Sequence, residues 1–278
     1  MFIYKQWEIF CKKLDSAGIN SVTASSLLDT HNDNDSFLVL KHDVETNPSK
    51  ALELAKIEKK YNHKGTYYVQ GYLLKNKKNL LILKKIQSLG HELSYHHDVM
   101  DSNNGDLSSA KREFEAYLNL FLQNGFKFKT VCQHGNPIVE RFGYNSNRDF
   151  FRNPNINEHF KDICDIMVNF KVKANVNYDY ISDSGYGWKI IFSPENNDVI
   201  DTTDKDIVLK NHKEVLNFIT SKKSIVISTH PHRWSKSYLR AKLKQILFFS
   251  IKKIAKTLYR IPFLKKIMSR FYYLAKKI

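Results

Sequence analysis

The chain is poor in cysteine and has no continuous apolar segment at its start. Its three cysteines, Cys11, Cys132 and Cys164, are widely spaced and odd in number. This argues against a disulfide framework or a cysteine-based zinc site, and favours a reducing compartment. The opening residues 1–18 interleave charges with apolar residues at helical spacing, without the apolar core and cleavage site of a secretory signal. We expect an amphipathic helix there.

Acidic residues are absent from the last part of the chain. The net charge is +16, from 44 Lys and Arg against 28 Asp and Glu, yet the residues from Lys236 onward hold 13 of the basic residues and no acid. The remainder is nearly balanced at +3. With 278 residues and 42% hydrophobic content, the chain can bury a full core. We therefore predict one domain at 1–235 and a basic tail at 236–278.

Short β-branched or aromatic runs alternate with helical patterns between Phe37 and Trp234. The predicted strands are 37–43, 65–70, 91–96, 126–133, 178–185, 189–192 and 224–230. The predicted helices are 48–61, 79–90, 107–125 and 211–223. Repeated strand–helix units of this size indicate an α/β fold with a parallel sheet, either open or closed as a barrel.

Titratable side chains gather where the predicted strands end. They are Asp43, Glu45, His96, His97, Asp98, His134, Asp183, His230 and His232. Functional groups of parallel α/β folds lie beyond the carboxyl ends of the strands, so we expect these side chains to converge. Asp and His ligands with an open position suit zinc or a similar divalent metal that activates water. A neighbouring carboxylate can accept a proton and a histidine can protonate the leaving group, which describes metal-assisted hydrolysis.

Five motifs in order carry a family resemblance. HDVE, GHELSYHHD, CQHGNP, YISDSGYGW and THPHRW together resemble the polysaccharide deacetylase superfamily, in its divergent branch with an HDVD-type first motif. Members of that branch often accompany surface-polysaccharide genes such as those for O-antigen. The resemblance spans 37–234. It implies a distorted (β/α) barrel of about seven strands, and metal-dependent removal of an N- or O-acetyl group from a sugar.

The resemblance also implies site residues. Asp43 matches the general base, and Glu45 stands where the branch has its second acid. His96 matches the first metal-binding histidine, and His230 matches the late histidine that acts as general acid. We predict a divalent metal, zinc with cobalt or nickel as alternatives, held by Glu45, His96 and His134, with Asp43 as base or further ligand.

Position 100 departs from the family pattern. Active deacetylases have a second histidine four residues after the first, and this chain has Met100. A complete site needs a substitute, for which we favour His134 because it follows a different strand. His97 and Asp98 are the alternatives, as ligands or as residues behind the ligands.

Aromatic and polar residues near these strand ends are candidates for substrate contact. Asp183, Tyr186 and Trp188 lie in a loop suited to a sugar, although the same composition is typical of a simple turn. The resemblance places Trp234 in the pocket wall. Arg148 is a further candidate, with a structural ion pair as the alternative.

Other acids and histidines of these motifs have plainer interpretations. Asp43 could instead cap the helix that begins near Pro48. His42 points to the opposite face from Asp43, and His91 lies at a strand start, so we expect structural roles for both.

The basic tail has an apolar helical face. Leu247, Ile251, Ile254 and Leu258 share one side of the predicted helix, and Pro262 is expected to interrupt it. The longest apolar run is far below the ~20 residues of a spanning helix. We predict that 236–278 lies on an anionic membrane surface, with packing against the barrel as the alternative and no nucleic-acid binding.

The sequence thus predicts a cytoplasmic enzyme, peripheral on the inner membrane, that deacetylates a sugar nucleotide or lipid-linked glycan during surface-polysaccharide assembly. An inactive glycan-binding or scaffold protein is the main alternative. A barrel hydrolase that cleaves another bond is a third.

Overall fold

The computed structural model describes residues 2–30, 36–136, 139–192, 194, 207–222 and 224–258. Its strands are β1 (Ser21–Val22), β2 (Phe37–Val44), β3 (Gly65–Gln70), β4 (Glu92–His97), β5 (Thr130–Gln133), β6 (Cys164–Asp165), β7 (Asp179–Ser182), β8 (Trp188–Ile191), β9 (Ile207–Leu209) and β10 (Ser224–Thr229). Seven neighbouring strands are parallel, in the order β6-β5-β4-β3-β2-β10-β7. β8 and β9 continue this sheet in antiparallel fashion, and β1 pairs with β2.

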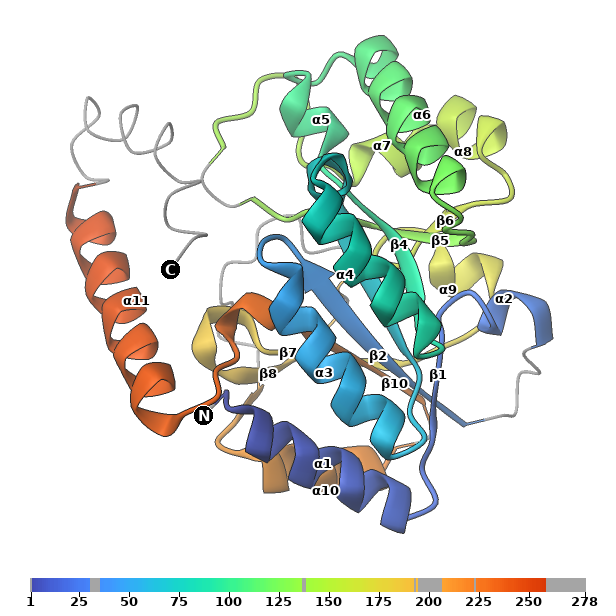
Figure 1. Cartoon of the computed structure of the whole chain (residues 1–278). Helices are drawn as coiled ribbons and strands as arrows, with labels where there is room; N and C mark the ends of the chain where they lie inside the picture. The colour runs from blue at the N-terminus through green and yellow to red at the C-terminus, as the bar shows by residue number, and fades with distance from the viewer. Residues whose placement is uncertain are drawn as a thin grey trace.

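Helices cover the outer face of the sheet (Figure 1). The longer ones are α1 (Tyr4–Ser16), α3 (Pro48–Lys60), α4 (Lys77–Ser88), α6 (Leu107–Gln123), α10 (His212–Thr220) and α11 (Tyr238–Leu258). The shorter ones are α2 (Leu27–Thr30), α5 (Val99–Ser102), α7 (Asp149–Arg152), α8 (Pro154–His159) and α9 (Phe170–Lys173). The described residues also form the 3₁₀ turns η1 (Gly71–Lys75), η2 (Ser184–Tyr186) and η4 (Pro231–Arg233).

Local sequence explains where these helices begin and which side they bury. α1 buries Trp7, Phe10, Cys11 and Leu14, whose spacing of three and four residues puts them on one face. α4 begins after Asn76, whose side chain accepts from two backbone N–H groups of the first turn. Asp106 caps α6 in the same way, and α3 begins with a proline, which needs no hydrogen-bond acceptor there.

Alternation along the strands separates an outer core from an inner one. Outward residues such as Leu38 and Leu40 pack with α1 and α10, whereas other outward residues pack under α3, α4 and α6. Inward residues from both ends of the sheet form a single cluster, which includes Cys164 of β6 and Ile191 of β8 as well as Val39 of the central strand β2. The sheet therefore curls until its inner face packs on itself, as in a barrel.

The α/β architecture of the sequence prediction is confirmed. Six of the seven predicted strands belong to the parallel part of the sheet, the predicted strand 189–192 is the antiparallel β8, and the parallel strand β6 was not predicted. The barrel is not closed by hydrogen bonds within the described residues, because the two end strands, β6 and β9, do not pair with each other. The predicted helix break at Pro262 lies outside the described residues. No helix in the described part of the chain is long and apolar enough to cross a membrane.

Candidate metal and catalytic site

Four parallel strands deliver the candidate residues to one edge of the sheet. β2 carries Asp43 and leads into Glu45, β4 carries His96, and His134 and His230 follow β5 and β10. The carboxyl ends of these strands are neighbours because β4 pairs with β5 and β2 pairs with β10. The expected convergence at the carboxyl edge therefore occurs.

Glu45, His96 and His134 form a compact cluster of metal-ligand type. One carboxylate oxygen and one ring nitrogen from each histidine all lie within 4.8 Å of one another. Nε2 of His134 is 3.3 Å from Oε1 of Glu45, and all three residues are buried. Two imidazoles and one carboxylate are the donors of catalytic zinc sites that keep a fourth position open.

The hydrogen bonding of His96 prepares it to bind a cation. Its Nδ1 lies 2.9 Å from the carbonyl oxygen of Cys132. A carbonyl oxygen only accepts, so Nδ1 carries the proton and the lone pair is on Nε2. Burial lowers the pKa of His96 to about 3, although the nearby Asp43 opposes this shift, and the ring is neutral at pH 7. A neutral, oriented imidazole is what a metal requires.

A buried ion pair holds Asp43. The Lys41 ammonium donates to both carboxylate oxygens at 2.6 and 2.5 Å, and to the hydroxyl of Ser228 at 3.2 Å. Burial raises the pKa of Asp43, but Lys41, the largest of the opposing charges, holds that pKa below its usual value. Asp43 is therefore an ionised carboxylate fixed beside the cluster. The alternative in which it caps α3 is wrong, because Asn47 is the N-cap residue of α3 and no side chain caps this helix.

His230 is oriented by Asp183. Nδ1 of His230 is 2.6 Å from Oδ1 of Asp183, and the backbone N–H of His230 donates to Oδ2 at 2.9 Å. Because the carboxylate accepts, Nδ1 carries a proton and Nε2 is left to exchange one. Nε2 is 3.8 Å from Oδ2 of Asp43, so it faces the cluster. Arg233 donates to Oδ1 of Asp183 at 2.8 Å and balances its charge.

A second group of three possible ligands shares His96. It consists of Asp43, His96 and Cys132, again within 4.8 Å. Burial raises the pKa of the Cys132 thiol well above its usual range, with Lys41 in opposition, and its Sγ donates to the carbonyl oxygen of Gln133 at 3.3 Å. A protonated thiol is a poorer metal ligand than the side chains of Glu45 and His134.

Three aromatic residues predicted to contact substrate lie elsewhere. Trp234 is fully buried and packs edge-on against Trp7 of α1, with ring centroids 5.1 Å apart. Trp188 joins the same outer cluster, and Tyr186 packs on Phe248 of α11. These predictions are corrected: the N-terminal helix and α11 cover the rings that the sequence suggested would line a pocket.

Of the two polar candidates for substrate contact, Asp183 has other surroundings, and substrate contact by Arg148 stays a prediction. Asp183 is fully buried, with both oxygens engaged by His230, so it orients a histidine and is not exposed to a sugar. Arg148 directly precedes α7 and is buried.

The proposed alternatives to His134 point away from the cluster or lie on another element. His97 is on the opposite face of β4, where its Nε2 is 2.9 Å from Asp165 and its ring packs among Phe114 and Phe150. Asp98 directly precedes α5 without capping it by its side chain. Met100 belongs to the apolar core under α6. The position at which active deacetylases have their second histidine is therefore occupied by a core side chain in this protein.

The sequence interpretation overlooked Lys41, Cys132 and Arg233. A signal for Lys41 was present, since it stands two residues before Asp43 in an otherwise apolar strand and shares its face. Cys132 gave a similar signal, since it stands two residues before His134 at the end of a predicted strand, whereas Arg233 gave none, because its contact with Asp183 joins distant parts of the chain.

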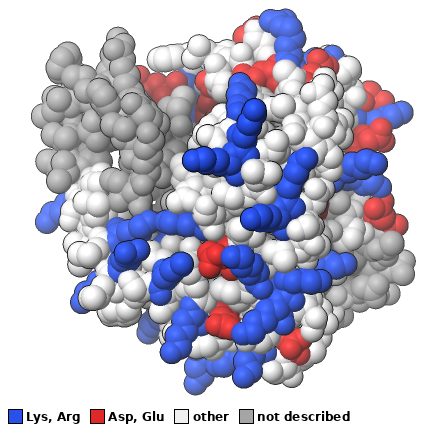
Figure 2. All heavy atoms as spheres, viewed as in Figure 1, with Lys and Arg blue, Asp and Glu red and all other residues white. Residues whose placement is uncertain are grey.

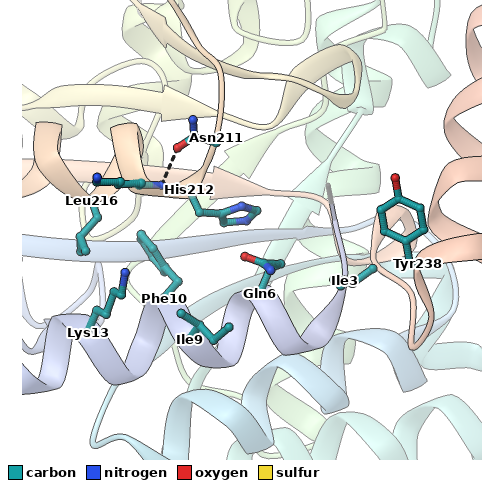
Figure 3. A pocket seen from close by; sticks show the side chains of 10 residues that line it. Ile3, Gln6, Ile9, Phe10, Lys13, Asn211, His212, Leu216 and Tyr238 are labelled. Atoms are coloured by element: carbon teal, nitrogen blue, oxygen red, sulfur yellow. Dashed lines mark hydrogen bonds between the residues drawn. The ribbon is translucent and has the colours of Figure 1, made fainter.

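A hollow of about 310 Å³ lies apart from this site, on the helical side (Figure 3). α1 and α10 form its walls, with Phe10, Lys13 and Leu216 among the lining residues, and Tyr238 lies at one end. It shares no residue with the metal-ligand cluster.

Comparisons with known proteins give structural similarity only. No family model matches the chain, and no curated protein does. Among solved structures it is similar to a CE4 esterase from Streptococcus mutans, at 14% identity and a TM-score of 0.44, over 84% of this chain and 89% of that one. It is also similar to the catalytic domain of peptidoglycan N-acetylglucosamine deacetylase from Eubacterium rectale, at 15% identity and a TM-score of 0.40, over 81% and 88%. A third similar structure is the peptidoglycan deacetylase PdaC from Bacillus subtilis, at 11% identity and a TM-score of 0.38, over 82% and 99%.

Proposed function

We propose that this protein is a metal-dependent hydrolase that removes an acetyl group from a sugar. The observation that carries the proposal is the convergence of Glu45, His96 and His134 beside Asp43 and His230. The resemblance of its motifs to the polysaccharide deacetylase superfamily motivates the choice of an acetylated sugar. We further propose a sugar nucleotide or lipid-linked glycan of surface-polysaccharide assembly as substrate.

The donor set fits a divalent metal, with zinc as the leading candidate and cobalt or nickel as alternatives. Glu45, His96 and His134 would hold the ion through one oxygen and two nitrogens, and Asp43 is close enough to His96 to add a fourth donor. Such an ion, when bound, lowers the pKa of a coordinated water and polarises a carbonyl oxygen.

Asp43 and His230 divide the proton transfers. The Asp43 carboxylate takes the proton released by water as it attacks the acetyl carbonyl. Nε2–H of His230 gives a proton to the nitrogen or oxygen that leaves the acyl carbon, while Asp183 balances the ring charge. Acetate and the free amine or hydroxyl are the products, so each proton is accounted for.

Lys41 gives Asp43 one fixed position. Two of its three hydrogen bonds go to that carboxylate, and both side chains are buried, so rotation of Asp43 would leave the buried ammonium with the Ser228 hydroxyl as its remaining partner.

Metal content and acetate release test this function together. The purified full chain is supplied with zinc, cobalt or nickel and incubated with acetylated sugar nucleotides and lipid-linked glycans. We expect bound metal and acetate release that chelator abolishes. Metal binding without acetate release would refute the choice of substrate. Saccharide binding that is unaffected by chelator would favour a glycan-binding protein instead.

A further inference from the structure

α11 has one face on the body of the protein and one face in solvent. Ala241 is buried and Phe248 packs on Tyr186 at a ring distance of 4.9 Å. Nζ of Lys244 donates to the carbonyl oxygen of His232 at 3.1 Å. The spacing of 241, 244 and 248 defines the inward side of the helix.

The outward side is apolar. Leu239 is 71% exposed, Leu243 65%, Ile246 53% and Leu247 45%. These positions follow the helical spacing of four, seven and eight residues, so they form one stripe opposite Ala241. Four large aliphatic side chains in one exposed stripe are costly in water and mark an interaction surface.

Cations border this stripe on both sides. At 100° per residue, Lys242 and Lys253 lie along one edge and Arg240 along the other, and all three are exposed. No Asp or Glu follows Lys236 in the sequence, so nothing acidic in this helix offsets them. The face formed by α1, α3 and α4 adds further Lys and Arg side chains (Figure 2).

The helix also adjoins the loops that hold the candidate acid. His232 and Arg233 belong to η4, which directly follows His230, and Tyr186 ends η2, which follows Asp183. The Arg233 guanidinium lies 5.8 Å from the ring of Tyr186 and donates to Asp183. A surface bound by the outward stripe would therefore be separated from these loops by the width of one helix.

We propose that the outer stripe of α11 docks on an anionic membrane surface, with its leucines at the boundary of headgroups and acyl chains and its cations at the phosphates. This docking does not depend on the hydrolytic function. Nucleic acid would engage the cations but leave the leucines in water, so the apolar stripe favours lipid. If the substrate is a lipid-linked glycan, docking would hold the protein on the surface that carries it.

Vesicle sedimentation of the full chain tests the proposal. We expect it to pellet with vesicles of phosphatidylglycerol and phosphatidylcholine, more weakly with phosphatidylcholine alone, and to lose affinity as salt rises. The triple variant Leu239→Gln, Leu243→Gln, Leu247→Gln should bind at least about tenfold more weakly, because it removes apolar area from the interface.

A matched control distinguishes this surface from general hydrophobicity. Leu81, Leu122 and Val172 are exposed on α4, α6 and α9, and their triple change to Gln should leave vesicle binding intact. Circular dichroism and thermal unfolding should show both variants folded. Equal pelleting of the wild type and the α11 variant would overturn the proposal. A second result would also overturn the proposal. In it, the wild type fails to pellet with vesicles but binds DNA, and the α11 leucine variant binds DNA equally well.

Discussion

Two buried clusters of histidines and carboxylates lie on opposite faces of β2, and they differ in what their polar atoms do. The outer cluster centres on Glu58, which accepts from Trp7 at 3.0 Å and from Tyr67 at 2.6 Å and lies 2.9 Å from His42. The inner cluster, with Asp43 on the same strand, directs donor atoms of three side chains toward one point.

Hydrogen-bond partners explain the difference. In the outer cluster His91 accepts from Gly65 N–H at 2.9 Å and therefore donates through Nε2 to the carbonyl of Ala55. Its two ring nitrogens are both used within the protein. His96 uses only Nδ1 in this way, which leaves Nε2 for the converging group. The same residue types thus build structure on one face and a candidate site on the other.

The largest expected contrast is between His96→Ala and His91→Ala. His96→Ala should reduce bound metal and acetate release to background, because it removes a ligand from the cluster. His91→Ala should keep both but lower the free energy of unfolding. Metal analysis and denaturant unfolding measure the two effects. Normal metal content in His96→Ala would contradict the assignment of His96 as a metal ligand and of His91 as a structural residue.

Asp43→Asn should slow acetate release by about 10² to 10⁴-fold, because it removes the general base. Metal content should change little, since Glu45, His96 and His134 remain. Initial rates under saturating metal provide the measurement. A rate within threefold or so of the wild type would mean that Asp43 is not the base.

Glu58→Ala should destabilise the fold by about 3–5 kcal/mol, because it leaves buried partners without their acceptor. Glu53→Ala on the same helix breaks only a surface pair with Lys56 and should cost about 1 kcal/mol or less. Urea unfolding compares them. Equal losses would contradict a structural role specific to the Glu58 cluster.

A smaller effect concerns pH. Burial raises the pKa of Glu58, but His42 and the other partners outweigh it and hold the pKa below the usual 4.5. A lowered folded pKa stabilises the protein above pH 4.5, and this contribution disappears as pH falls through the folded value. The free energy of unfolding should therefore fall more steeply with acid in the wild type than in Glu58→Gln. Parallel curves would show that another group dominates.

The strands and their polar ends could be predicted from sequence because both depend on local pattern. Alternation in FLVLKHDVE places His42 and Asp43 on opposite faces, and the structure agrees. The parallel arrangement then brings His134 near His96 without further information.

The aromatic residues could not be placed in the same way. Whether Trp188 and Trp234 face a sugar or the core depends on their packing against α1 and α10, which lie far from them in sequence. The role of Asp183 could not be predicted either, because its hydrogen-bond partner His230 is 47 residues away in sequence. Long-range packing decides such roles, and composition of a loop does not.

Zinc content of the wild type and of His134→Ala tests the central claim most directly. In the proposed site, His134 would take the ligand role that Met100 cannot fill, so the account depends on it. We expect one zinc ion per chain in the purified wild type after metal loading, and far less in a folded His134→Ala variant. Equal zinc content in the two proteins would contradict the account.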